Sequence, residues 1–375
     1  MTVKKKPENK SIFDEMPAVT EEEAALEKKK KRARRKKVNT VLDRIAGFCI
    51  ATAIVVCVGA LAFDYLCVKG PSESFRNTWF NTFFETRRFG FINNLFYSED
   101  ELEEIITRSK PAEVVMDAVI DYSLINIAEE KTDANGVDAY GLVDDDGDGI
   151  IYKTLNFRGS TGYLVVVLDP KRVFLGTAQD ASVTWQTNGL VLDDMVAKYN
   201  AIGGINAGIF EDDSGGGLGW PPSGITIAEG IVYQDYQTGP VAGFDSNGIL
   251  YVGEYDLADC QKFGLQYACT FGPVLIANGQ KMDEQTLESG VNPRTVIGQR
   301  ADGAVLLLVV DGRQAYSFGL TYGDCADLLL EYGCINAMNM DGGSSTCMYY
   351  NGQLVNHPSN QAGGTRNLPT AWLFK

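Results

Sequence analysis

The sequence predicts an α+β fold: a mixed, largely antiparallel sheet with flanking helices, preceded by one N-terminal transmembrane helix. Three observations lead to this prediction. Short apolar runs separated by glycine turns fill residues 150–375, glycine accounts for 40 of the 375 residues, and one stretch alone is long and apolar enough to cross a bilayer. The hydrophobic share of 45% and the charged share of 22% are ordinary for a globular protein and exclude wholesale disorder.

Residues 1–44 form a basic tail, which we expect to be cytoplasmic. They hold 14 Lys/Arg against 8 Asp/Glu, whereas the remaining 331 residues hold 19 against 41. The formal net charge of −16 therefore belongs to the body of the protein. Because an acidic body repels polyanions, no nucleic-acid partner is predicted.

Residues 45–68 are predicted to form a transmembrane helix. Positions 45–63 hold 19 uncharged, mostly apolar residues, and nine of the ten residues 28–37 are Lys or Arg. About 20 apolar residues span a bilayer, and the positive-inside rule places the basic end in the cytoplasm. A cleaved signal peptide is disfavoured by the long basic region and the missing cleavage motif, and a buried core helix by the missing polar face. We therefore expect a single-pass protein of the cell membrane, which contacts the lipid bilayer through one helix and has an extracytoplasmic body.

The body divides into a juxtamembrane helical or linker region, residues 69–149, and a domain over residues 150–375. Ser98 and Glu101 form a capping box that opens a helix in the first part. In the second part, Thr321 and Asp324 form a second capping box, which opens a helix over residues 322–332. Gly333 ends this helix. The predicted strands are 163–168, 225–232, 274–277, 295–299 and 304–310, with hairpin turns at Asp302-Gly303 and Asn351-Gly352.

An acidic run at residues 144–149 resembles part of a calcium loop. Asp144, Asp146 and Asp148 fit its first three ligand positions, but the twelfth position, which requires a bidentate Glu, is Leu155. The three aspartates are candidate calcium ligands, and an acidic surface turn is the alternative.

Polar clusters stand next to the predicted strands, where loops converge on a rigid sheet. They comprise Asn206, the pair Arg294 and Thr295, the run Asp311-Gly312-Arg313, and the run from Asn339 through Asp341, Gly342, Gly343, Ser344 and Ser345. The two carboxylates Asp311 and Asp341 suit a base, a nucleophile or an acceptor for sugar hydroxyls. Arginine forks bind phosphate or carboxylate oxygens, and a Gly-Gly pair lets backbone N–H groups approach an anion. Each motif taken alone is as well explained by an ordinary turn.

His357 is the one histidine of the chain, which excludes a multi-histidine metal site. Either it is a solvated loop residue, or it transfers protons or contacts phosphate.

Taken together and in order, these motifs resemble the phosphodiester glycosidase family. The resemblance rests on the stretches NAGIF (206–210), FGPVLIANG (271–279), NPRTVIG (292–298), VVDGR (309–313) and the run from GLTYGDCADLL to MNMDGGSS (319–345). It implies hydrolysis at the anomeric carbon of a sugar-1-phosphodiester, which releases the sugar and a phosphomonoester. Asp341 and Asp311 are then the catalytic candidates, with the division of roles open. Arg294 or Arg313 would stabilise the phosphate, Asn206 and Asn339 would bind the sugar, and Arg366 matches an arginine of the family.

The sequence thus predicts a membrane-anchored glycosidase acting on glycan phosphodiesters such as wall polymers or phosphate-linked exopolysaccharide. A non-catalytic protein that binds or scaffolds cell-surface polysaccharide is the alternative. A calcium-responsive surface protein built on the acidic run is a third interpretation.

Overall fold

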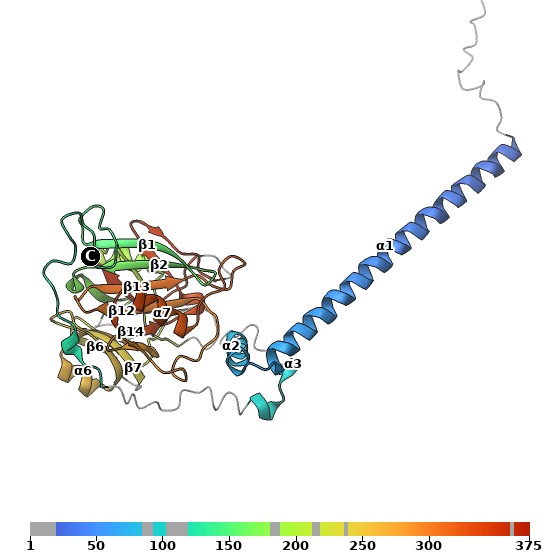
Figure 1. The fold of residues 1–375 in the computed structure, drawn as a ribbon. Helices are drawn as coiled ribbons and strands as arrows, with labels where there is room; N and C mark the ends of the chain where they lie inside the picture. The colour runs from blue at the N-terminus through green and yellow to red at the C-terminus, as the bar shows by residue number, and fades with distance from the viewer. Residues whose placement is uncertain are drawn as a thin grey trace, which may run out of the picture. The chain divides into compact units, whose positions relative to one another are not determined.

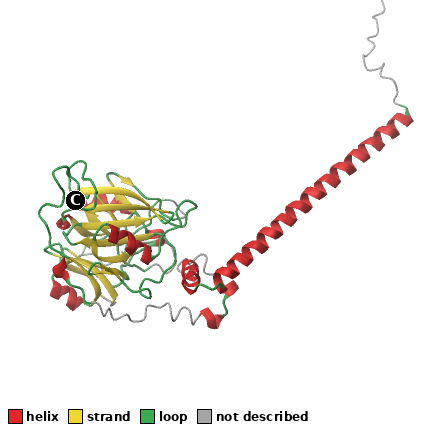
Figure 2. Cartoon of the chain, in the orientation of Figure 1, coloured by secondary structure: helices red, strands yellow, loops and turns green. Residues whose placement is uncertain are grey.

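The computed structural model describes residues 20–84, 93–102, 119–180, 188–211, 218–235, 239–360 and 364–375. The chain divides into two compact units, Met1–Cys67 and Val68–Lys375. The secondary structure is drawn in Figures 1 and 2.

In the first unit the structure describes a single long helix, α1 (Glu21–Lys69), whose last residues belong to the second unit. By length and composition it is able to cross a membrane, and its most apolar window is fully exposed. The predicted segment 45–68 lies inside it. The helix starts earlier because Lys and Arg are good helix formers, so the basic run continues the same helix.

A seven-stranded sheet forms the centre of the second unit, and every pair of neighbours in it is antiparallel. Its strand order is β1-β2-β13-β12-β14-β10-β11, and the first five lie side by side in Figure 1. The bounds are β1 Ile150–Phe157, β2 Ser160–Val167, β13 Val305–Val310, β12 Arg294–Arg300, β14 Cys334–Met340, β10 Val274–Ala277 and β11 Gln280–Lys281.

Two five-stranded antiparallel sheets complete the domain, in the orders β16-β15-β4-β17-β3 and β6-β5-β9-β7-β8. The first contains β16 Gln353–Leu354, β15 Met348–Tyr350, β4 Gly203–Asn206, β17 Thr370–Phe374 and β3 Val173–Thr177. The second contains β6 Ile231–Asp235, β5 Ile225–Ala228, β9 Leu265–Thr270, β7 Gly239–Asp245 and β8 Leu250–Tyr255. The predicted α+β class with a largely antiparallel sheet is confirmed.

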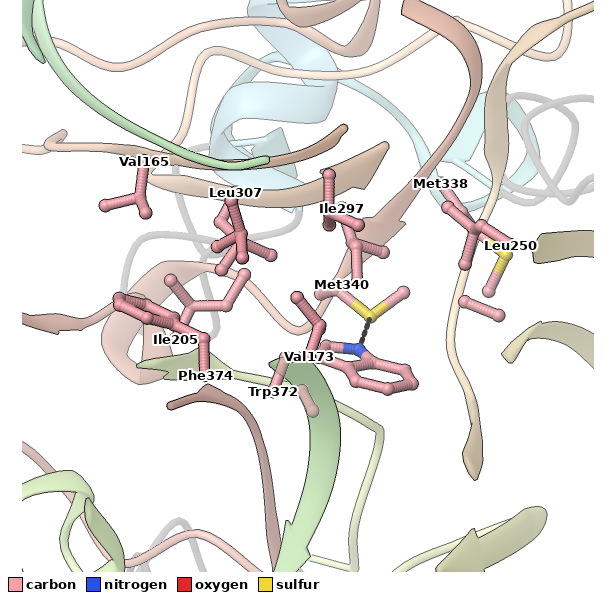
Figure 3. Packing of buried hydrophobic residues seen from close by; sticks show 14 of the residues in the cluster. Val165, Val173, Ile205, Leu250, Ile297, Leu307, Met338, Met340, Trp372 and Phe374 are labelled. Atoms are coloured by element: carbon pink, nitrogen blue, oxygen red, sulfur yellow. Dashed lines mark hydrogen bonds between the residues drawn. The ribbon is translucent and has the colours of Figure 1, made fainter. Parts of the chain in front are cut away.

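The main core lies where side chains of all three sheets meet, and Figure 3 shows part of it. Trp372 of β17 is fully buried there, and its indole N–H donates to the Met340 sulfur at 3.3 Å. Strand β13 is buried on both faces: Val305, Leu307 and Val309 join this core, and the alternate residues join a second cluster. Burial on both faces explains why the strand reads as one continuous apolar run.

Helices cover the remaining faces. Helix α7 (Tyr322–Glu331) packs on the second face of the seven-stranded sheet through Cys325, Ala326, Leu328 and Leu329. Its apolar spacing places these residues on one side of the helix. Helix α5 (Leu192–Tyr199) lies against the β4 sheet and α6 (Leu257–Phe263) against the β7 sheet.

The short helices α2 (Glu73–Phe84) and α3 (Asn93–Phe96) precede the sheets, and α2 packs on the loop before β12. Thr82 accepts a hydrogen bond from the Val291 amide at 2.9 Å through Oγ1, and Asn81 Nδ2 donates to Glu288 Oε1 at 3.4 Å. The loop approaches the helix so closely at Gly290 that a Cβ there would collide with the backbone of Thr82.

Most local predictions are confirmed. Both capping boxes form, and both hairpin turns have the left-handed glycine that their sequences predict: Gly303 has φ +88° and Gly352 has φ +81°. The predicted strand 225–232 is wrong. Glu229 and Gly230 both have positive φ, so this run is a hairpin of two strands, β5 and β6.

Candidate active site

Asp311 directly follows β13 and is enclosed by hydrogen-bond donors. Its side chain is fully buried. Oδ1 accepts from Asn356 Nδ2 at 3.1 Å and from the His357 amide at 2.9 Å, and Oδ2 accepts from the Tyr163 hydroxyl at 3.1 Å. Burial, followed by the charge of Asp311, raises the pKa of Tyr163, which therefore stays a protonated donor. Several donors stabilise the buried carboxylate without a permanent positive charge.

His357 connects this buried carboxylate to solvent. Its Nδ1 lies 3.3 Å from Asp311 Oδ2, and 67% of its side chain is exposed. A carboxylate on one ring nitrogen fixes the proton there and leaves Nε2 to exchange protons with a ligand. Between the two roles left open by the sequence, this geometry favours proton transfer.

Asn356 joins Asp311 to the loop after β14. Besides its bond to the carboxylate, its Nδ2 donates to the Thr346 carbonyl at 3.2 Å, and its Oδ1 accepts from the Met348 amide at 2.8 Å. Sequence reasoning missed both Asn356 and Tyr163. The position of Asn356 next to the single histidine was the one local signal for it.

Asp341 begins the turn that follows β14, and its side chain is half-buried. Its amide donates to the Ala207 carbonyl at 3.0 Å, and its own carbonyl accepts from Asn206 Nδ2 at 2.5 Å. Gly343, two residues on, has φ +62°, a left-handed conformation that favours glycine. The Asp341 backbone is thus held through both its amide and its carbonyl, which fixes the point from which its side chain extends.

Asn206 lies at the end of β4 and is completely buried. Its Oδ1 accepts from Thr295 Oγ1 at 2.7 Å and from the Cys347 amide at 3.1 Å. Together with its bond to Asp341, these contacts make Asn206 and Thr295 positioning residues for the Asp341 turn. Their direct contact with substrate stays a prediction.

Two arginines flank the 3₁₀ turn Gly343–Ser345. Arg313 donates through Nε and Nη2 to Asn292 Oδ1 at 3.1 and 3.0 Å, and a Cβ at Gly343 would lie 3.2 Å from its Nη1. Arg366 donates through Nη1 to Ser344 Oγ at 3.2 Å, and its guanidinium carbon lies 4.8 Å from the centre of the Phe210 ring. Of the sequence-predicted residues, Gly343 thus lies close to Arg313, Ser344 and Ser345 lie close to Arg366, and Gly342 precedes the turn.

Arg294 lies apart from this pair. It is buried, donates to the carbonyls of Leu320 at 3.0 Å and Gly290 at 2.6 Å, and stacks over Tyr322. Successive residues of a strand point to opposite faces of the sheet. The neighbouring Thr295 contacts Asn206, so Arg294 points to the α7 face.

Asn339 is buried near the end of β14 and donates to the Gly272 carbonyl at 2.9 Å. Within the part of the chain that the structure describes, its Oδ1 accepts no hydrogen bond.

The acidic run forms a compact loop in which ligand atoms of Asp144, Asp146 and Asp148 lie within 4.8 Å of one another. Backbone amides already bond these carboxylates: Asp144 accepts from Gly147 and Gly149 at 3.1 and 3.0 Å. Leu155 is buried in β1 and provides no ligand atom. With one oxygen from each aspartate, calcium would need further ligands to reach the six to eight oxygens that it takes in proteins.

Comparison with known proteins gives one family match and several similar proteins. Residues 199–375 match the family model described as Phosphodiester glycosidase. The chain is 30% identical over 205 residues to the SPbeta prophage-derived uncharacterized protein YomE of Bacillus subtilis (strain 168). The matched region covers 52% of this chain and 30% of that protein. It is 28% identical over 176 residues to N-acetylglucosamine-1-phosphodiester alpha-N-acetylglucosaminidase of Bos taurus, covering 41% of this chain and 32% of that protein.

The human protein of the same name is 25% identical over 232 residues, covering 54% of this chain and 42% of that protein. The chain thus spans less than half the length of these curated relatives. Among solved structures, the zebrafish catalytic domain of that name superimposes with a TM-score of 0.51 at 19% identity, covering 60% of this chain and 81% of that chain. This likeness shows a shared fold.

Proposed function

We propose that this chain, which carries a phosphodiester glycosidase domain in residues 199–375, hydrolyses the anomeric C–O bond of sugar-1-phosphodiesters. Water adds at the anomeric carbon, the C–O bond breaks, and the products are the free sugar and a phosphomonoester. One observation carries the proposal: the exposed His357 is oriented by the buried Asp311, in a domain that also holds Asp341 beside a turn flanked by two arginines.

The two arginines bind the phosphate. Arg313 and Arg366 present planar forks next to the turn Gly343–Ser345, and such forks match the oxygens of a phosphodiester. Their fixed positive charge stabilises the negative charge that grows on the departing phosphate. The bond of Arg313 to Asn292, and the stacking of Arg366 on Phe210, orient both groups before substrate arrives.

Burial divides the roles of the two carboxylates. Asp311 is enclosed by its donors and has no exposed surface, so it acts through His357 and is a positioning residue. Asp341 is half-buried and is the carboxylate that reaches the anomeric carbon or its attacking water. His357 moves a proton at Nε2, between the reacting water and the departing oxygen.

The long apolar helix supports a membrane anchor in the same proposal. α1 carries the basic run at its start, so the positive-inside rule puts the N-terminus in the cytoplasm and the glycosidase domain outside. Substrates in that location are phosphate-linked glycans of the cell surface or exopolysaccharide. A fusion of alkaline phosphatase to Lys375 tests the orientation, because the reporter is active only outside the cytoplasm.

The full-length protein in detergent, incubated with the methyl phosphodiester of N-acetylglucosamine 1-phosphate, tests the activity. We expect free N-acetylglucosamine and methyl phosphate from the wild type, and release reduced at least 100-fold in Asp341→Asn. Asp194→Asn, an exposed aspartate on α5, is the matched control and keeps full activity. Absence of release from several sugar-1-phosphodiesters, by protein that melts cooperatively, contradicts the proposed function and leaves a glycan-binding protein.

A further inference from the structure

We propose that α2 is an interfacial helix, whose aromatic stripe binds the phospholipid surface of the membrane that α1 crosses. The stripe consists of Phe75, Trp79 and Phe83. This inference rests on the membrane anchor of the proposed function and deepens it, because it gives the anchored domain a second contact with the bilayer. The partner is the headgroup layer of a bilayer, and the contact involves no group of the candidate active site.

The stripe is a continuous aromatic side of α2. Its members are spaced four residues apart, and side chains at this spacing are neighbours on a helix. The rings of Phe75 and Trp79 stack with centroids 6.4 Å apart, and those of Trp79 and Phe83 meet edge to face at 5.0 Å. Phe75 is 52% exposed. Tryptophan and phenylalanine on one side of a helix are typical of segments that lie in the boundary between headgroups and acyl chains.

Other sides of α2 hold it on the domain. Asn81 and Thr82 contact the loop before β12. Phe80 is 1% exposed, stacks on Phe84 with centroids 5.4 Å apart, and meets the Tyr97 ring edge to face at the same distance. At about 100° per residue, the stripe lies between these two contact sides. A bilayer that binds the stripe therefore binds a helix that is already fixed to the domain.

The junction between α1 and α2 is short and folded. The predicted membrane segment ends at residue 68, and the four steps from Lys69 to Glu73 span at most about 14 Å. Lys69 Nζ donates to Glu101 Oε1 at 2.8 Å and lies 5.4 Å from the centre of the Tyr97 ring. Arg76 donates through Nη1 to the Gly70 carbonyl. Once α1 spans the bilayer, α2 therefore starts next to the headgroup layer.

Local charge separates this part of the chain from the rest of the body. Residues 69–97 hold four Lys/Arg against two Asp/Glu, whereas residues 45–375 as a whole hold 19 against 41. An anionic lipid surface repels the acidic body and attracts a basic segment. The aromatic stripe and the positive charge thus favour the same partner, a bilayer that contains anionic phospholipid.

Tryptophan quenching tests the contact in the full-length protein, placed in nanodiscs of phosphatidylethanolamine and phosphatidylglycerol. The Trp79 signal is the emission of a protein minus that of its Trp79→Phe counterpart. We expect phosphatidylglycerol brominated near the top of its acyl chains to lower this signal about twofold, because interfacial rings reach that depth. Aqueous iodide should change it little. Trp220→Phe removes another half-buried tryptophan and is the matched control, which keeps the lipid quenching.

A charge on the stripe provides a second test. Phe75→Glu should move the Trp79 signal from lipid quenching to iodide quenching, because a carboxylate draws the stripe into water. Ile231→Glu places the same charge on another exposed apolar side chain, which is 48% exposed, and should change neither reading. Iodide quenching without lipid quenching in the wild type overturns the proposal. Protection of Trp79 from both quenchers also overturns it, because protein then covers the stripe.

Alkaline carbonate extraction of membranes tests α1 by itself. If the full-length protein is released, the anchor of the proposed function fails. The protein is then added to preformed vesicles of the same two lipids: quenching of Trp79 by the brominated lipid still supports the interfacial helix, whereas its absence overturns it. None of these readings depends on turnover, so failure of sugar release leaves them unchanged.

Discussion

Asp311 and Asp138 are both buried aspartates, but their partners differ. Asp311 belongs to the candidate active site, and Asp138 has a structural role. Asp138 forms an ion pair at 2.6 Å with Arg300 Nη1, and both side chains have no exposed surface. Its other oxygen accepts from the amides of Tyr140 and Leu142 at 2.8 Å each. Asp311 has comparable burial, but its donors are neutral and its titratable neighbour, His357, is exposed.

The comparison shows that the partner, more than the burial, determines what a buried carboxylate does. A guanidinium does not lose its proton in the physiological range, so Asp138 and Arg300 form a fixed pair that joins the loop before β1 to the end of β12. An imidazole can accept and release a proton during a reaction, so Asp311 can stabilise a charge that forms on His357 as the reaction proceeds. Four substitutions test this distinction.

Asp311→Asn should have the largest effect, on the reaction. We expect kcat to fall about 10³-fold, because the amide no longer stabilises the charged imidazole or fixes its tautomer. The melting temperature should change little, since the surrounding donors and acceptors keep a polar partner. Sugar release and circular dichroism melting measure the two quantities. Full activity in this variant would contradict a role of Asp311 in the reaction and would make it a structural residue like Asp138.

Asp138→Asn should have the reverse profile. Removing the charge leaves Arg300 buried with Asp302 as its one remaining ion-pair partner among the described residues, and a loss of about 3 kcal/mol of unfolding free energy is expected. Urea denaturation measures the loss, and kcat should stay within twofold. A variant that unfolds normally but loses activity would contradict a purely structural role.

His357→Gln should reduce kcat about 10³-fold, as much as Asp311→Asn does, because glutamine keeps a polar side chain but transfers no proton. Sugar release at saturating substrate measures this loss. In the Asp311→Asn background the same change should have almost no further effect, since both act as one unit. Additive losses would indicate that the two residues work independently.

Asp302→Asn should have the smallest effect, and it depends on pH. Burial alone would raise the pKa of Asp302, but hydrogen bonds from Arg300 and the Ala304 amide lower it below its ordinary 3.8. Because the folded pKa lies below the unfolded one, the carboxylate stabilises the fold above about pH 4, and this contribution is lost as pH falls further. Melting temperatures from pH 3 to 7 should therefore decline less steeply in Asp302→Asn than in the wild type.

Local signals predicted much of the fold. The cap pair Thr321 and Asp324 and the glycines 303 and 352 act within four residues, so their outcome depends little on the rest of the chain. Glu229 carried no such signal: it adopts positive φ because the β5–β6 pairing requires a turn there, and this pairing split the predicted strand.

The candidate site was predicted in its residue types but not in its partnerships. Asp311 and His357 are 46 positions apart, and Tyr163 is 148 positions from Asp311, so no spacing rule connects them. The sequence offered Arg294 and Arg313 as alternatives. Because successive strand residues point to opposite faces of the sheet, Arg294 points toward α7, whereas Thr295 contacts Asn206. Contacts of this kind depend on the register between strands, which sequence patterns do not specify.

The contact between α2 and Gly290 has a practical consequence for work on a fragment that lacks the apolar helix α1. The loop that α2 supports includes Asn292, the partner of Arg313, and Pro293, whose carbonyl accepts from the Gly343 amide at 3.0 Å. Truncation at β1, or at residue 199 where the family match begins, would remove this support from the loop that holds Asn292, the partner of Arg313. A fragment that begins before Glu73 keeps α2 and its contacts with this loop, so we expect it to keep the orientation of Arg313.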